Sequence, residues 1–185
     1  MYGRKSAVSL KIMVCVANNY NPGGKMPFNH FDEAGRAVMV DVSGKQPTMR
    51  NAVASAKVIL KRDTLEKILN GMTTKGDVLA VSRLAGIVAA KKTPELIPLS
   101  HPLAIHAVSV NFSTDLESGT ILVESTVKAF ERTGVEMEAM VSASVAALTI
   151  YDMCKGIDKG ITITEIALSY KDGGKSGVYR REGNQ

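Results

Sequence analysis

Apolar and polar residues alternate along several stretches of this 185-residue chain with the two-residue period typical of half-buried strands. The stretches run over residues 37–42, 50–60, 104–114, 120–131 and 161–170. Their Val, Ile and Thr content favours strands, although the alanines of residues 50–60 leave a helix open there. The polar turn "DLESG" joins the third stretch to the fourth and predicts a β-hairpin.

A helical period predicts two helices between the second and third predicted strands. Asp63 is suited to cap the first helix, which we expect to end near Leu69. Asp77 is suited to cap the second helix. The apolar residues of this second helix fall on one stripe, which we expect to pack on the sheet. They are Val78, Val81, Leu84, Ala85 and Val88.

The most apolar helical stretch covers residues 134–156, "GVEMEAMVSASVAALTIYDMCKG". It has no charged residue from Ala139 to Ile150, which predicts a helix that is buried nearly all round. Glu136 and Glu138 lie in its first turn, where carboxylates suit the positive end of the helix dipole. The charged residues are therefore confined to the two ends of this helix.

Asp152 contradicts the dipole rule, because it lies in the last turn, where a carboxylate is disfavoured. Lys155 follows three residues later and shares its face, so the two predict an ion pair. The pair is either a structural salt bridge or an acid/base pair with mutually tuned pKa values. Glu138 lies about 20 Å from Asp152 along the axis, so one site using both needs a long substrate or helix ends from two subunits.

The order of predicted elements indicates an α+β fold with a largely antiparallel sheet and helices on one face, close to the ferredoxin-like split βαβ arrangement. Residues 32–177 form the predicted catalytic domain. Residues 1–31 are interpreted as a flexible or artificial lead, because the apolar run after Lys11 is too short for a signal peptide and residues 18–31 are rich in Asn, Pro and Gly; a transit-like role is the minor alternative. The polar residues 178–185 are expected to be a frayed tail.

The net charge of +5 comes mostly from the lead, which holds four basic residues and no acidic one. The remainder holds nineteen basic and eighteen acidic residues, so we expect no nucleic-acid partner. Cys15 and Cys154 form no disulfide framework, which favours a cytoplasmic location. No stretch of about 18 uninterrupted apolar residues predicts a membrane span.

Three polar groups in loops are candidates for chemistry. His101 follows Ser100 in an apolar loop stiffened by prolines, which suits the presentation of an imidazole, although core histidines are also common in such loops. Lys75 stands before a predicted helix N-terminus, where an anion would be favoured. The "KDGGKSG" loop lacks the spacing of a Walker motif but suits a phosphate, as it also suits a solvated hairpin end. His101 and His106 make a weak metal pair, since no Cys or carboxylate lies at ligand spacing.

Five motifs, "TKGDV", "LIPLSHPL", "TGVEMEA", "ALTIYDMCK" and "GGKSG", occur in an order that resembles the cyclic pyranopterin monophosphate synthase family of molybdenum cofactor biosynthesis. The resemblance covers residues 32–177. It implies a ferredoxin-like fold and a homohexamer, built as a trimer of dimers, with sites at the dimer interface. It also implies a lyase that converts (8S)-3′,8-cyclo-7,8-dihydroguanosine 5′-triphosphate into cyclic pyranopterin monophosphate and diphosphate.

The resemblance assigns site residues by motif. The implied catalytic residues are Asp152, Lys155 and Lys75, acting by general acid–base catalysis. The implied substrate-binding residues are Leu99, Ser100, His101, Glu136, Met137, Glu138, Lys171 and Lys175, and our own hypothesis adds Arg50 as a triphosphate contact. In our hypothesis, His101 and the glutamates bind the guanine-derived edge, and the other basic side chains hold the triphosphate.

One motif departs from the family pattern, because Ser100 stands where the family loop usually has Cys. Ser is isosteric and polar, so we expect substrate contact to survive without any thiol chemistry. No cofactor is required by the sequence, and Mg²⁺ is compatible with it.

Two other classes of function fit parts of the sequence. An RNA-binding ferredoxin-like module would need aromatic side chains on its strands, where only Phe112, Phe130 and Tyr170 occur, and not in the usual pattern. A purely structural oligomer would leave Asp152 and Lys155 as a plain ion pair. Turnover by variants of these two residues separates the readings.

Overall fold

The sheet is organised around its middle strand, β1 (Thr48–Ile59), which has a paired strand on each side. Its alternate residues Ala52, Ala54, Ala56 and Val58 are fully buried, as the two-residue period predicts. Both neighbours, β3 (Thr120–Glu131) and β4 (Thr162–Asp172), run antiparallel to it. This central strand confirms the strand interpretation of residues 50–60.

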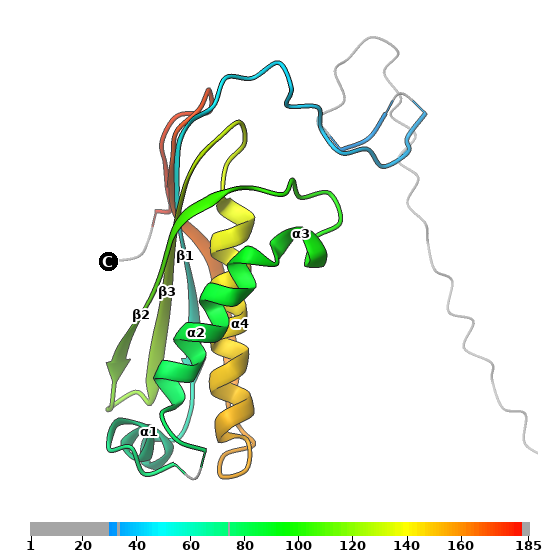
Figure 1. The fold of residues 1–185 in the computed structure, drawn as a ribbon. Coiled ribbons are helices and arrows are strands. Elements are labelled where there is room, and N and C mark those ends of the chain that lie inside the picture. The colour runs from blue at the N-terminus through cyan, green and yellow to red at the C-terminus, as the bar shows by residue number, and fades with distance from the viewer. Residues whose placement is uncertain (1–29, 33, 74, 183–185) are drawn as a thin grey trace, which may run out of the picture.

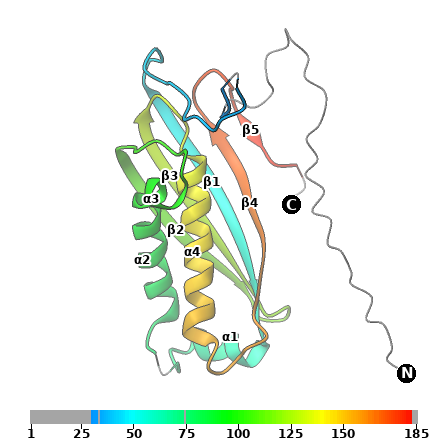
Figure 2. The ribbon, with the colours of Figure 1, turned by 90° about the vertical axis from the view of Figure 1, so that its right-hand side faces the viewer.

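A computed structural model describes residues 30–32, 34–73 and 75–182 (Figure 1). The remaining elements are α1 (Arg62–Leu69), α2 (Val78–Lys91), α3 (Thr93–Leu96), β2 (Ile105–Asp115), α4 (Glu136–Cys154) and β5 (Tyr179–Arg180). The antiparallel sheet has the order β2-β3-β1-β4-β5, and α2 and α4 cover one of its faces (Figure 2). The first four strands thus have the split βαβ order, which confirms the predicted α+β, ferredoxin-like class.

The contact between α2 and α4 relies on small residues. α2 buries Ser82, Gly86, Ala89 and Ala90, and a Cβ added at Gly86 would lie 3.0 Å from the Ser142 carbonyl oxygen of α4. The backbones of the two helices therefore approach closely. This leaves the helix layer with large side chains on its outer surface.

The predicted inward stripe of α2 is wrong beyond Val78. Val81, Leu84 and Val88 are 45%, 63% and 41% exposed. Hydrophobicity alone suggested that the largest apolar residues face the sheet. The close approach of α4 instead selects the small residues of α2 for the buried face, so the larger side chains point outward.

Three local expectations also differ from the structure. Residues 37–42 form no strand with any described residue, and within the described part of the chain they take part only in an isolated bridge between Phe31 and Ala37. Asp63 lies in the first turn of α1 and does not cap it. Asp158 satisfies this helix start instead, because its carboxylate accepts hydrogen bonds from the Lys61 backbone N–H at 2.9 Å and from the Thr64 hydroxyl at 3.3 Å. This contact is long-range, so no local pattern reveals it.

The C-terminal residues include a short strand rather than a wholly frayed tail. Tyr179–Arg180 forms β5 and pairs with Tyr170 and Lys171 of β4. The Arg181 backbone N–H also donates to the Ser169 carbonyl at 3.0 Å. Residues 183–185 and the lead up to residue 29, including Cys15, lie outside the described residues.

None of the described helices is both long enough and apolar enough to cross a bilayer.

We expect Gly86→Val to lower the free energy of unfolding by about 1–3 kcal/mol, because the larger side chain would overpack the contact between α2 and α4. Gly44→Val is the matched control, since no atom lies within 4 Å of a Cβ placed at Gly44. Urea unfolding of both variants measures the difference. Equal midpoints for the two variants would contradict the close packing.

Candidate functional site

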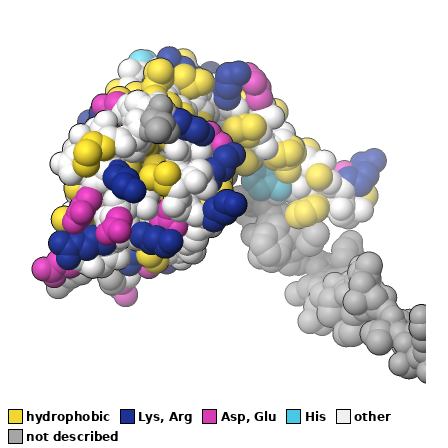
Figure 3. Space-filling model, turned by 90° about the horizontal axis from the view of Figure 1, so that it is seen from below, with side chains coloured by type: hydrophobic (Ala, Val, Ile, Leu, Met, Phe, Trp, Pro, Cys, Tyr) yellow, Lys and Arg dark blue, Asp and Glu magenta, His cyan; other side chains and the backbone are white. Residues whose placement is uncertain are grey.

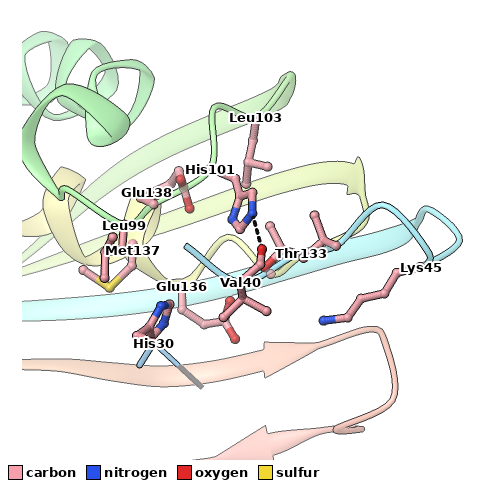
Figure 4. Close-up of a pocket in the computed structure, with 13 residues that line it drawn as sticks. His30, Val40, Lys45, Leu99, His101, Leu103, Thr133, Glu136, Met137 and Glu138 are labelled. Atoms are coloured by element: carbon pink, nitrogen blue, oxygen red, sulfur yellow. Dashed lines mark hydrogen bonds between the residues drawn. The ribbon is translucent and has the colours of Figure 1, made fainter. Parts of the chain in front are cut away.

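A cavity of about 310 Å³ lies at the N-terminal end of α4 (Figure 4). Its walls come from the segment before β1, the loop between α3 and β2, the turn between β3 and α4, and the first turn of α4. The lining residues are His30, Val40, Val42, Lys45, Leu99, Ser100, His101, Leu103, Thr133, Gly134, Glu136, Met137 and Glu138. Six of the predicted substrate-binding residues are therefore in one place.

His101 is fixed by a backbone contact. Its Nε2 lies 2.8 Å from the Val40 carbonyl oxygen, which can only accept a hydrogen bond, so Nε2 carries the proton (Figure 4). In the neutral ring this leaves Nδ1 as an acceptor. The same bond holds the segment before β1 over the cavity. The stiff loop thus presents the imidazole as the sequence predicts.

Glu138 is the buried carboxyl group of the cavity. Glu138 is only 2% exposed, and its Oε1 has no hydrogen-bond partner in the described structure. Burial, reinforced by the negative charge of Glu136, raises the pKa of Glu138 to about 7. This carboxyl group therefore changes its protonation state near neutral pH.

Glu136 has a different environment in the same helical turn. Its carboxylate forms a 2.7 Å ion pair with Lys171 of β4, and both side chains are about three-quarters buried. Lys171 also donates to the Ser176 hydroxyl at 3.3 Å. The pair ties the start of α4 to the strand that leads into the C-terminal loop. Met137, between the two glutamates, is 37% exposed.

Arg50 lies beneath that C-terminal loop. Its guanidinium donates to the backbone carbonyls of Glu131 and Arg132 at 3.0 and 3.1 Å. A side chain at Gly174 would collide with this guanidinium, so glycine allows the loop to lie directly on it. Lys175 follows Gly174 and is exposed. Arg50, Lys171 and Lys175 thus lie at one end of the molecule without lining the cavity.

Asp152, Lys155 and Lys75 form a second cluster at the C-terminal end of α4. The Asp152 carboxylate lies 2.7 Å from the Lys155 ammonium and 3.6 Å from that of Lys75. Lys75 also donates to the Asp152 backbone carbonyl at 2.9 Å. All three side chains are about half exposed. The cluster joins the loop before α2 to the end of α4.

The charges of this cluster stabilise one another. The hydrogen bond and charge of Lys155, followed by the charge of Lys75, lower the pKa of Asp152. The same hydrogen bond raises the pKa of Lys155. The predicted ion pair is therefore confirmed, and a second lysine is added to it. The lowered pKa of Asp152 and the raised pKa of Lys155 both favour a carboxylate beside an ammonium group at neutral pH.

The structure does not bring the cavity and the lysine cluster together within one chain. Glu136 and Glu138 start α4, whereas Asp152 lies in its last turn. Figure 3 shows the end of the molecule that carries α1, where basic and acidic side chains are interspersed. The cavity and the lysine cluster therefore lie at opposite ends of one helix.

Sequence patterns missed several lining residues. His30 fell inside the assumed lead, and Val40 and Val42 were assigned to a strand. Lys45 contributes the only Lys or Arg side chain of the cavity lining among the described residues. The only sequence signal for Lys45 was its position between Gly44 and a polar loop.

Across residues 30–32, 34–73 and 75–182, no three His, Cys, Asp or Glu side chains are grouped to hold a metal ion.

The chain is similar to known proteins over most of its length. The model of the MoaC family matches residues 39–174. Cyclic pyranopterin monophosphate synthase of Geotalea uraniireducens is 74% identical over 85% of this chain and 98% of the relative. The protein of the same name from Geobacter sulfurreducens is 69% identical over 86% of this chain and 100% of the relative. The synthase of Heliobacterium modesticaldum is 55% identical over 84% of this chain and 98% of the relative.

The raised pKa of Glu138 predicts a pH dependence of stability. Because the folded value, about 7, exceeds the ordinary value of 4.5, the stabilisation by the neutral form is complete below pH 4.5 and is lost as the pH rises through 7. We expect the wild type to lose about 2 kcal/mol of unfolding free energy from this group between pH 5 and pH 7.5. Glu138→Gln should lack this loss.

Denaturant unfolding at several pH values measures both proteins. Glu124→Gln, at an exposed position on β3, is the matched control and should keep the wild-type pH dependence. Identical pH profiles of wild type and Glu138→Gln would show that Glu138 does not titrate in this range.

Proposed function

This chain belongs to the MoaC family, and we propose that it catalyses the lyase reaction of cyclic pyranopterin monophosphate synthase. The proposed substrate is (8S)-3′,8-cyclo-7,8-dihydroguanosine 5′-triphosphate, and the products are cyclic pyranopterin monophosphate and diphosphate. The observation that carries this proposal is the identity of about 70% to synthases of that name over nearly their whole length. The cavity and the lysine cluster supply chemistry that suits it.

Opening a purine-derived ring and closing a pterin ring requires several proton transfers and no redox step. We assign these transfers to Lys75 and Lys155, with Asp152 holding both ammonium groups. Because the pKa of Lys155 is raised, this lysine enters the reaction as a proton donor. It becomes a base only after it has lost a proton to the substrate.

The cavity is the proposed subsite for the purine-derived rings. Leu99 and Met137 supply apolar contact, and Ser100 and His101 supply polar contact. Lys171, Lys175 and Arg50 are the proposed triphosphate contacts. A guanidinium has five N–H groups, so Arg50 keeps donors after binding two carbonyls. These cations would stabilise the departing diphosphate.

The separation of the cavity from the lysine cluster supports a site built between two subunits. The exposed Leu84 on α2 and Leu148 on α4, 63% and 57% accessible, leave apolar side chains uncovered on the helix layer. A two-fold axis that places two copies of α4 antiparallel would set the start of one beside the end of the other. We therefore propose a homo-oligomer, a hexamer built as a trimer of dimers.

The RNA-binding alternative gains no support from the sheet surface. Phe112 packs against the core, and the ring of Tyr170 lies under the Arg180 guanidinium at 4.6 Å. Only Phe130 of these three is open, at 51% exposed, and a single open ring does not make the pattern of stacked aromatics. Stacking platforms need open rings.

A cytoplasmic location and an accessory role for Mg²⁺ carried by the triphosphate stay proposals. Turnover with and without a chelator tests the latter.

We expect Asp152→Asn and Lys155→Ala each to lower turnover of the cyclised nucleotide by about a hundredfold or more, because each removes a member of the acid–base cluster. Product formation is followed by chromatography. Lys159→Ala is the matched control: Lys159 is exposed and has no ion pair in the described residues, so this variant should keep wild-type turnover. Correctly assembled Asp152→Asn and Lys155→Ala proteins with full activity would rule out the assigned mechanism.

The shared site predicts complementation between inactive variants. His101→Ala damages the cavity, whereas Lys155→Ala damages the lysine cluster. After dissociation and equal mixing, random pairing into dimers should restore about a quarter of the wild-type sites. Activity is measured before and after mixing. No recovery despite subunit exchange, confirmed by mass spectrometry, would place each complete site within one chain.

A further inference from the structure

Glu138 is a buried acid without a counter-ion. No Lys, Arg or His side chain lies within ion-pair distance of its carboxyl group in the described structure, whereas Glu136 has Lys171 at 2.7 Å. A buried carboxylate that lacks a cation is costly, and the group lowers this cost by binding a proton. The two glutamates of one helical turn are therefore in opposite electrostatic environments.

The surroundings of Glu138 do not supply the missing charge. On its own helix the nearest titratable group is Glu136, whose negative charge favours the neutral form of Glu138. From the loop before β2 comes His101, whose Nε2 proton is committed to the Val40 carbonyl. The segment before β1 brings His30 and Lys45 to the cavity, but neither forms an ion pair with Glu138 (Figure 4).

Glu138 belongs to the wall of the cavity, and one of its two carboxyl oxygens is shielded from solvent. Oε1 is buried and has no partner within the described chain, and Glu138 is one of the lining residues. The Ser100 side chain lies beside this carboxyl group and partly offsets the rise of its pKa, but Oε1 stays without a hydrogen bond. An unpartnered buried oxygen is costly and calls for a further partner. The ligand of the cavity is the natural source of that partner.

We propose that Glu138 is a neutral carboxylic acid in the free enzyme and donates its proton in a hydrogen bond to the substrate. The acceptor is a carbonyl oxygen or an unprotonated nitrogen on the purine-derived ring. Glu136, which forms an ion pair with Lys171, accepts from a ring N–H. The cavity thus pairs one donor with one acceptor, which differs from our hypothesis that both glutamates accept. This inference rests on the proposed function.

A protonated carboxyl group also fits the substrate's charge. The triphosphate brings several negative charges, and a second carboxylate at the ring edge would repel them. A neutral acid provides directionality without that repulsion. The proposed lysine cluster of the partner subunit carries its own carboxylate, so its positive charge is partly compensated.

Infrared difference spectroscopy of the ligand-free enzyme tests the protonation state directly. At pH 6 the wild type should show the carbonyl stretch of a protonated carboxyl group, and the band should decline as the pH rises through 7. Glu138→Gln should lack this band, whereas Glu95→Gln, an exposed control on α3, should keep it. A wild-type spectrum at pH 6 without a band specific to Glu138 overturns the proposal, whatever the activity.

Kinetics tests the direction of the hydrogen bond. Gln can donate through its amide group but cannot ionise, so Glu138→Gln should keep kcat/KM at least about tenfold above Glu138→Ala and lose the alkaline decline of the wild type. If Glu138→Gln is as inactive as Glu138→Ala while Glu138→Asp is active, the carboxylate is the working form and the proposal is wrong. A wild type without turnover refutes the proposed function alone, because the infrared result stands without substrate.

Discussion

The rigidity of α4 is the constraint on which the rest of the structure depends. The helix is nineteen residues long, is nearly uncharged along its body and packs through small residues against α2 and the sheet. It therefore holds its two ends at a fixed separation, with Glu138 at one and Asp152 at the other. No movement of side chains can join these ends within one chain, so helix length itself argues for a site shared between copies.

Local chemistry made much of this architecture predictable. The long apolar run with charged ends identified α4, the polar turn identified the β2–β3 hairpin, and Asp77 caps α2 by accepting the Ala80 backbone N–H at 2.9 Å. The Asp152–Lys155 pair followed from a spacing of three residues. Each of these features depends on neighbours in sequence, which a single chain displays directly. The resemblance to a family added Lys75, whose contact with Asp152 spans 77 positions.

Features that depend on distant contacts could not be predicted in the same way. The short apolar stretch of residues 37–42 suggested a strand, but these residues follow an irregular path, along which the Val40 carbonyl contacts His101. The outward face of α2 is set by how closely α4 approaches, which no hydrophobic period encodes. Lys45 was missed for the same reason, since only the folded path of its segment brings it to the cavity.

The close contact between Arg50 and Gly174 has a consequence for folding. The start of β1 and the end of β4 meet there, with Gly173 against the Met49 backbone carbonyl, although more than a hundred residues separate them in the chain. Closing so large a loop costs entropy before any contact repays it. The pairing of β4 with β1 and the contact of Gly174 with Arg50 therefore share the cost of closing one large loop. The proposed phosphate contacts Arg50 and Lys175 come together only when β4 has paired with β1.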